Sequence, residues 1–261
     1  MLIGRERERA RLREAIAERR SLLVYGPAGS GKSALLHDVL SSVGACLCRR
    51  CIVCAAEGAP SNIWLRLVTA LAESGDSEVL TRAENDAASA EHFENWARAQ
   101  TSLRLRGIIH RAARTRDYLI FLDAIAPLPD GVYRLLQEWV WSGRTPVILL
   151  GRGSTQDELG KASQLYWHEG LRLYLGPLER ASAEAVLEDK IERFHLAKFA
   201  DAEFRNFVLE RSERLPGKIA QLCKLASNAA YHCGGHVKLH TLAVDFLLQQ
   251  ELQKDWAARH A

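Results

Sequence analysis

The sequence predicts an α/β protein in which helices cover a parallel sheet and a helical segment follows. Short apolar runs alternate with segments of helical periodicity as far as residue 175, an alternation typical of parallel sheets. A glycine-rich loop joins the first apolar run to the next helical segment. Beyond Pro177 the apolar residues keep helical spacing only. We therefore expect a core domain over residues 1–176 and a helical domain over residues 177–261.

The sheet is expected to contain five buried strands. Each is a short apolar run that ends at a glycine, a polar residue or a charge, as buried strands do. The strands are predicted at residues 22–25, within 46–56, and at 118–123, 146–150 and 171–175.

Helices are expected between these strands and after them. In the first one, Leu12 and Ile16 lie one helical turn apart and define its buried side. The others are predicted at residues 33–40, 62–73, 91–116 and 131–141 in the core domain, and at 182–194, 201–213, 218–231 and 240–256 beyond it.

The composition is that of an ordinary globular protein. Of 261 residues, 48% are hydrophobic and 26% charged. The net charge of +3 does not by itself indicate a nucleic-acid partner. No run of about 18 uncharged apolar residues predicts a membrane span. The amino terminus becomes charged at once, unlike a secretory signal, so the expected localisation is cytoplasmic.

Residues 26–33, GPAGSGKS, form a phosphate-binding loop motif. The motif lies between a predicted strand and a predicted helix, which is the context it requires. Its glycines let backbone amides surround phosphate groups, and the helix amino terminus adds a positive dipole end. Lys32 is expected to neutralise the β- and γ-phosphates, and Ser33 to bind Mg²⁺. The predicted loop residues are Gly26, Pro27, Ala28, Gly29, Ser30, Gly31, Lys32 and Ser33.

A carboxylate at the end of the third predicted strand is the expected partner of this loop. Asp123 follows an apolar run, where it can orient Mg²⁺. The next residue is Ala124, where many ATPases of this type carry glutamate, so hydrolysis is expected to be slow or absent. Glu57, at the end of the second predicted strand, is a candidate to orient the attacking water. The alternative is that Glu57 is a surface residue at a strand end.

These motifs together resemble the AAA+ branch of Orc/Cdc6-type initiators, transposition helper ATPases and STAND signalling ATPases. Residues 3–12, IGRERERARL, resemble an amino-terminal box that lies against adenine in that branch, which assigns Gly4 and Arg5 to the nucleotide. Residues 26–33 match its Walker A motif, and residues 119–123 resemble its Walker B strand.

Later segments extend the resemblance over nearly the whole chain. Arg152, after the fourth predicted strand, is similar in place to an arginine that senses the γ-phosphate in STAND proteins. Residues 175–178, LGPL, resemble the opening of the helical lid, and residues 215–219, LPGKI, its sensor 2 segment. The resemblance implies that Lys218 contacts phosphate within the chain; the alternative is a lysine at a helix start in water. By position, Arg172 is the candidate for an arginine that reaches a neighbouring subunit's site. The alternative is an arginine at a strand edge that faces solvent.

The resemblance implies a parallel-sheet P-loop NTPase core of the ASCE/AAA+ type, followed by a small all-helical lid domain. It also implies ATP and Mg²⁺ as cofactors and an ATP-dependent homo-oligomer. The predicted function is a nucleotide-dependent switch or assembly factor acting with DNA in replication or transposition. One alternative is a STAND-like signalling ATPase that binds protein partners in its ATP form. A weaker alternative is a RecA-like motor.

A stretch without acidic residues, 98–116, is the predicted DNA contact. On a helix, Arg104, Arg111 and Arg114 project to one side. Such a face can contact duplex DNA phosphates without reading bases. The alternative is a solvated helix face.

Four cysteines lie within nine residues, at Cys46, Cys48, Cys51 and Cys54. A zinc site requires converging thiolates. A strand sends Cys51 to the face opposite Cys46 and Cys48, so packing of apolar thiols in the sheet is favoured over a metal site.

Overall fold

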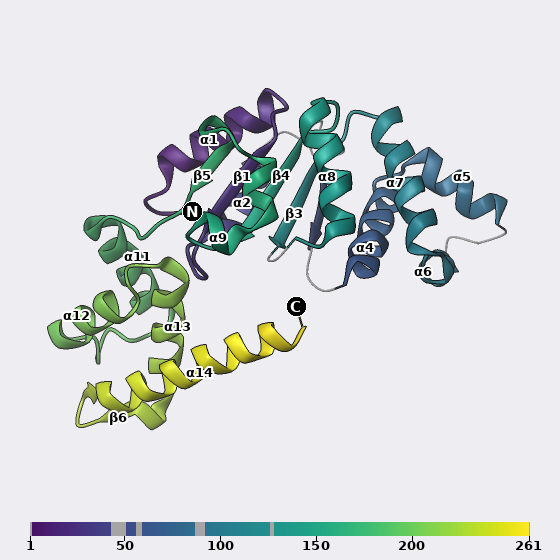
Figure 1. Ribbon diagram of the computed structural model, residues 1–261. Helices are drawn as coiled ribbons and strands as arrows, with labels where there is room; N and C mark the ends of the chain where they lie inside the picture. Colours follow the sequence, from purple (N-terminus) through teal and green to yellow (C-terminus); the bar gives the residue numbers. More distant parts are fainter. Residues whose placement is uncertain (1, 43–50, 56–58, 87–91, 126–127, 261) are drawn as a thin grey trace. The chain divides into compact units, whose positions relative to one another are not determined.

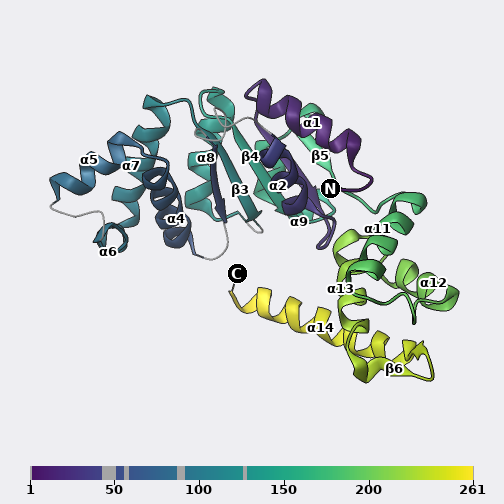
Figure 2. The same cartoon turned by 180° about the vertical axis from the view of Figure 1, so that it is seen from behind.

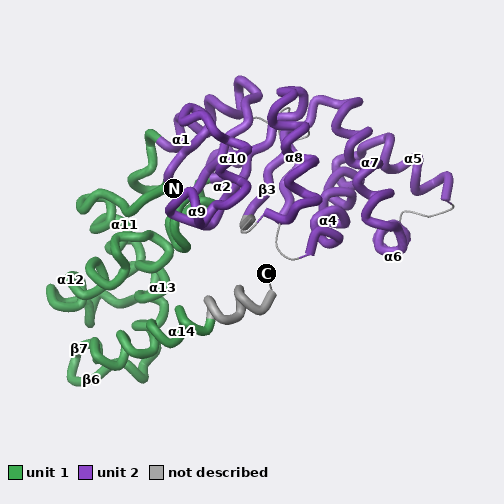
Figure 3. The backbone as a smooth tube through the Cα atoms, viewed as in Figure 1, with its two compact units in different colours: residues 1–7, 26–35, 175–260 green, residues 8–25, 36–174, 261 purple. Residues whose placement is uncertain are grey.

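The computed structural model divides the chain into two compact units (Figure 1, Figure 3). Residues 2–42, 51–55, 59–86, 92–125 and 128–260 are described. Unit 1 consists of residues 1–7, 26–35 and 175–260. Unit 2 consists of residues 8–25 and 36–174, together with residue 261.

Unit 2 is built on the expected five-stranded sheet, which Figure 2 shows from behind. Its strand order is β2-β3-β4-β1-β5, so β2 and β5 form the two edges. The strands β2, β3 and β4 pair in parallel, as do β1 and β5. The strands are β1 (Leu22–Gly26), β2 (Cys51–Ala55), β3 (Leu119–Ile125), β4 (Val147–Arg152) and β5 (Arg172–Tyr174).

Helices lie before β1 and in the segments between the strands, with two differences from expectation. The single helix predicted over residues 91–116 is two helices, because Thr101 caps the second one by accepting a bond from the Arg104 amide. Short helices also occur where none was predicted. The elements are α1 (Glu6–Ala17), α2 (Lys32–Ser42), α4 (Pro60–Glu73), α5 (Ser77–Asn85), α6 (Phe93–Ala99), α7 (Ser102–Thr115), α8 (Asp130–Ser142), α9 (Gln156–Leu159), α10 (Lys161–Leu165) and η2 (Glu169–Leu171).

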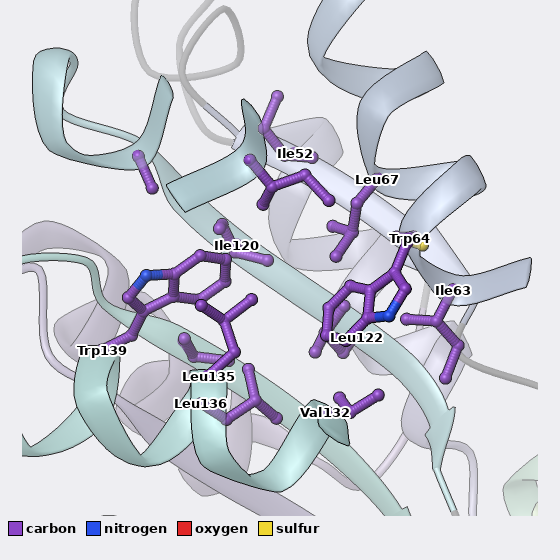
Figure 4. Close-up of a cluster of buried hydrophobic side chains, with 14 of the residues drawn as sticks. Ile52, Ile63, Trp64, Leu67, Ile120, Leu122, Val132, Leu135, Leu136 and Trp139 are labelled. Carbon is purple, nitrogen blue, oxygen red and sulfur yellow. The ribbon is translucent and has the colours of Figure 1, made fainter. Parts of the chain in front are cut away.

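The main core of unit 2 lies on one face of the sheet. Register pairs Ile52 with Ile120, and these side chains share that face with Leu122. Trp64 from α4 and Trp139 from α8 are buried in the same cluster (Figure 4). Burial of such side chains contributes roughly 1.5–3 kcal/mol each, so this face holds the sheet and its helices together.

The helical segment of unit 1 has its own core. Leu187, Phe204, Leu222 and Phe246 come from its four helices and are buried together, and Ile3 packs against them. The helices are α11 (Arg180–Arg193), α12 (Ala202–Arg211), α13 (Pro216–Ala226) and α14 (Leu239–His260), with η3 (Ala229–Tyr231) between the last two.

The expected helical character of this segment is confirmed, with one addition. A short antiparallel hairpin pairs β6 (His232–Cys233) with β7 (His236–Val237). Gly234 and Gly235 form its turn with φ of 57° and 84°, values that glycine adopts without strain. The purely helical expectation missed this Gly-Gly turn signal.

Among the described residues, none of the helices has the length and apolar character needed to cross a lipid bilayer.

Candidate nucleotide-binding site

The phosphate loop connects the end of β1 at Gly26 to the start of α2 at Lys32. Gly29 and Gly31 have φ of +82° and +93°. Other residues adopt this region only at a cost, so the glycines allow the tight path of the loop. The Leu35 amide bonds to the Gly31 carbonyl at 2.8 Å and begins the helix.

Lys32 lies inside this loop and is only 8% exposed. Its ammonium group donates to the carbonyls of Gly26 at 2.7 Å and Pro27 at 3.0 Å. It also donates to the Ser30 hydroxyl at 3.3 Å. The loop therefore holds a buried cation with three donors, the chemistry that binds phosphate oxygens.

The two residues predicted to lie against adenine contact protein groups of unit 1. Arg5 is 5% exposed and donates to the carbonyls of Ser30, at 3.3 Å, and Gly176. It thus joins the phosphate loop to the start of the helical segment. Gly4 has φ of +71°, and a Cβ there would lie 2.4 Å from the Cβ of Ser182 in α11. Gly4 therefore permits close packing of the amino terminus on this helix.

The first turn of α13 packs directly on the phosphate loop. The Gly217 amide donates to the Gly29 carbonyl at 2.8 Å. A Cβ on Gly217 would lie 2.7 Å from the Gly29 Cα, so a side chain would displace the backbone. A Cβ on Gly29 would lie 3.3 Å from the Lys218 amide nitrogen. The segment predicted as sensor 2 and the phosphate loop are therefore neighbours within unit 1.

Lys218 has a carboxylate partner that the sequence did not indicate. Its ammonium group lies 3.1 Å from Glu213, and the two side chains are 19% and 68% exposed. Glu213 and Arg214 have φ of +54° and +58°, so a strained turn precedes α13. No motif marks Glu213, whose role depends on this turn.

The remaining predicted nucleotide residues of the described chain lie in unit 2. Asp123 is a half-buried residue of β3, and Arg152 ends β4 with an exposed side chain. Arg172 begins β5 and donates to the carbonyls of Ser163, at 2.8 Å, and Tyr166. Its guanidinium is thus held by its own unit rather than facing solvent. Glu57 lies outside the described residues.

The predicted DNA-facing arginines do not share one environment. All three are exposed, but Arg104 forms an ion pair with Asp86, and Arg111 with Glu78 at 2.9 Å, whereas Arg114 forms no ion pair among the described residues. The hydrogen bond from Arg111 holds the pKa of Glu78 below its usual value, so the carboxylate stays ionised. Two of the three arginines are therefore partly neutralised. The stretch itself contains no acid, but α5 and the residue after it supply two.

The cysteine segment does not form a metal site in the part of the chain that the structure describes. Cys46 and Cys48 lie outside that part. Cys51 is half-buried and Cys54 is buried, and the strand directs them to opposite faces. Burial raises the pKa of the Cys54 thiol to about 12, so the thiol is protonated at neutral pH. No cluster of three metal-binding side chains occurs among the described residues.

A known family of proteins matches the segment that contains the phosphate loop. Residues 1–140, more than half of the chain, match the model of the AAA ATPase domain. The chain belongs to the AAA ATPase family. Its Walker A loop is the one described above, and its sheet order and helical segment agree with the expected P-loop NTPase fold. No curated protein sequence is significantly similar to the chain.

Solved structures share the fold of this AAA ATPase. The Orc1 protein of Aeropyrum pernix, in complex with DNA, matches with a TM-score of 0.63 and 18% identity, over 94% of this chain and 66% of its own. The Walker-type ATPase PABY2304 of Pyrococcus abyssi matches with a TM-score of 0.55 and 13% identity, over 97% of this chain and 75% of its own. Cdc6p of Pyrobaculum aerophilum matches with a TM-score of 0.56 and 12% identity, over 91% of this chain and 65% of its own. The chain thus spans about two thirds of the Orc1 and Cdc6p chains, and the likeness concerns the fold alone.

Proposed function

We propose that this AAA ATPase is a nucleotide-dependent switch that acts with duplex DNA as a replication or transposition helper. The contact between the phosphate loop and the first turn of α13 carries the proposal. Because these elements touch, a ligand that changes the loop changes the free energy of the helical segment as well. The family supplies the nucleotide-dependent ATPase activity.

ATP is proposed to bind with its phosphates at residues 26–33. Lys32 already lies within the loop, where its ammonium group exchanges carbonyl partners for phosphate oxygens. The amino terminus of α2 adds its dipole and free amides. The proposed ligands of Mg²⁺ are the Ser33 hydroxyl and the Asp123 carboxylate. Both are oxygen donors, which this ion prefers, and bound Mg²⁺ neutralises phosphate charge.

The lid is proposed to respond through α13. Lys218 follows Gly217, which is bonded to the loop at Gly29. When phosphate binds, Lys218 can exchange the Glu213 carboxylate for a phosphate oxygen. The difference in affinity between the two arrangements sets how far the equilibrium moves.

Hydrolysis is proposed to be slow, because Ala124 follows Asp123 in place of an acid. Glu57 is the proposed water-orienting residue, and Arg152 the proposed γ-phosphate sensor. Assembly into an ATP-dependent oligomer would use an arginine of a neighbouring subunit. Arg172 serves there only if its guanidinium leaves the carbonyls of Ser163 and Tyr166. Glu57→Gln should abolish turnover and spare ATP binding; unchanged turnover would remove Glu57 from the mechanism.

Duplex DNA is the proposed partner on two grounds. The Orc1 structure that shares this fold contains DNA, and unit 2 carries exposed arginines. A second candidate, the STAND-like switch with a protein partner, is favoured by one surface of α14. There Val244, Leu247, Leu248 and Leu252 are 45–67% exposed, an unusual row of apolar side chains.

Measurement of ATP turnover with and without duplex DNA tests the proposal. Lys32→Ala removes the loop cation, and Lys224→Ala, at an exposed position of α13, is the matched control. We expect DNA to stimulate turnover in the wild type and the control, and Lys32→Ala to abolish it. ATP binding with turnover that ignores DNA would favour the protein-binding switch. Absence of ATP binding would contradict both functions.

A further inference from the structure

A pocket of about 830 Å³ opens at the amino-terminal ends of β3 and β4. Tyr118 directly precedes β3, and Arg144 comes three residues before β4. In a parallel sheet this edge is opposite the one at which the strands' carboxyl ends, and hence Asp123, lie. The pocket is therefore distinct from the residues assigned to the nucleotide. Its lining is Ser74, Ala113, Arg114, Thr115, Arg116, Asp117, Tyr118 and Arg144.

The lining is strongly cationic. Three arginines face one carboxylate, Asp117, which also lies 3.9 Å from Arg19. Arg114 and Arg144 are exposed. Among the described residues, neither guanidinium group forms a hydrogen bond or an ion pair. Both groups are therefore available to an anion that enters the pocket.

The surrounding structure fixes the positions of these arginines. The buried Thr145 hydroxyl donates to the Ala113 carbonyl at 3.2 Å. This bond joins the segment just before β4 to the last turn of α7, and Arg144 and Arg114, next to its two ends, both line the pocket. Two carbonyl groups in the last turn of α7 are hydrogen-bonded: Ala113 accepts the Thr145 bond, and Ala112 accepts bonds from the Thr115 hydroxyl and the Arg116 amide.

The third arginine is braced by a buried carboxylate. Asp76 is fully buried, accepts the Tyr118 hydroxyl at 2.6 Å and caps α5 through the Val79 amide at 3.0 Å. Arg116 lies 3.8 Å from Asp76 and donates to the Ser77 hydroxyl at 3.1 Å. Burial, with the bond to Asp76, raises the pKa of Tyr118, so its hydroxyl stays protonated and keeps this arrangement.

We propose that this arginine pocket binds the phosphate groups of a nucleic-acid backbone. Guanidinium groups bind phosphate through paired hydrogen bonds, and several at one edge suit a run of phosphodiesters. The proposal rests on the DNA association proposed above and assigns it to Arg114, Arg116 and Arg144. The paired Arg104 and Arg111 are not part of the site.

The test compares two double variants that lower the net charge equally. Arg114→Gln with Arg144→Gln removes the two exposed pocket arginines. Arg104→Gln with Arg111→Gln is the matched control. It removes two ion-paired arginines from α7, the helix that also carries Arg114. Affinity for a mixed-sequence duplex is measured by fluorescence anisotropy from about 50 to 200 mM salt. Thermal melting and ATP binding are recorded for each protein, so that a folding defect or a lost nucleotide site is seen separately.

The pocket variant should lose about tenfold or more in affinity, and its salt slope should fall by about 2. The control should lose less than about threefold, and ATP binding should not change in either. If both variants lost the same duplex affinity, or neither lost any, the pocket would not be the nucleic-acid site. A wild type that binds ATP but no duplex would overturn the pocket and the DNA role together. If a labelled tripolyphosphate probe bound the wild type but not the pocket variant, and no duplex bound, the pocket would be assigned to a free phosphate compound instead. That result would overturn the nucleic-acid site.

Discussion

Two groups of cations in this chain are held in different ways. At the phosphate loop, Lys32 of the loop and Arg5, which bonds to it, are buried and bonded to backbone carbonyls. Along α7, the arginines are exposed, and Arg104 and Arg111 pair with carboxylates from elsewhere in the fold. Lys32 is bound by backbone oxygens of its own loop, so the loop fixes its position and a local motif predicts it. An exposed arginine is defined by tertiary neighbours, and the residues around it in the sequence do not reveal them.

The largest effect is expected where the phosphate loop meets α13. Gly217→Ala places a methyl group 2.7 Å from the Gly29 Cα, and overpacking of this kind costs about 1–3 kcal/mol. We expect a lower free energy of unfolding and roughly tenfold weaker ATP binding, the affinity equivalent of about 1.4 kcal/mol. Denaturant unfolding and calorimetric titration measure these two quantities.

Gly131→Ala is the control for this change. Gly131 is also the second residue of a helix, α8, and a Cβ there meets nothing within 4 Å. Alanine at this half-buried helical position, where its methyl group has space, should be neutral or stabilise by up to about 1 kcal/mol. Equal effects of the two substitutions would show that the loop contact carries no energy.

The arginine pocket also contains a buried group, because Arg116 lies beside the buried Asp76, which accepts the Tyr118 hydroxyl. In this respect the pocket resembles the phosphate loop. Tyr118→Phe removes the hydroxyl that donates to Asp76 and leaves a buried carboxylate short of one partner, at a cost of about 1–3 kcal/mol. Chemical denaturation should register this loss. Tyr133→Phe, at a half-buried position of α8, should change stability by less than about 0.5 kcal/mol. Comparable stability of both variants would mean that Asp76 does not depend on Tyr118.

A smaller effect is expected from the acid that holds Lys218. Glu213→Gln removes its charge and leaves Lys218 to the nucleotide, so ATP affinity should rise about two- to fivefold, within the range of an exposed ion pair. Glu210→Gln, at an exposed position of α12, is the control and should leave affinity unchanged. Weaker ATP binding by Glu213→Gln would indicate that Glu213 serves the nucleotide directly.

The smallest effect should come from release of an arginine on α7. Glu78→Gln removes the partner of Arg111 and should raise duplex affinity about twofold and steepen its salt dependence. Glu84→Gln changes the net charge equally from an exposed position of the same helix and should do less. A gain as large as the loss in the pocket variant would show that the ion-paired arginines of α7 matter to duplex binding as much as the pocket arginines do.

Local sequence signals predicted most of the fold. The five apolar runs became the five strands, and the glycines and lysine of residues 26–33 became a loop between β1 and α2. The break before α7 was missed, because the Thr101 cap is weak as a pattern without its geometry. The hairpin at residues 232–237 was missed because its strands are only two residues each.

The sequence predicted the parts of the candidate site that lie in one local motif, but not the contacts between distant segments. The packing of Gly217 on Gly29 depends on a contact between segments 188 positions apart, and only the family resemblance brought them together. Glu213, Glu78 and Asp86 carry no motif, because their roles depend on which cation the fold places beside them. The domain limits, the catalytic roles of Glu57, Arg152 and Arg172, and the Mg²⁺ ligands stay predictions.

The most direct test of the account is amide hydrogen exchange with and without ATP and Mg²⁺. The account predicts slower exchange at residues 26–33 and also at residues 213–219, with both changes absent in Lys32→Ala. Protection of the phosphate loop alone, with unchanged exchange at residues 213–219, would contradict the claim that the nucleotide acts on the helical segment through α13.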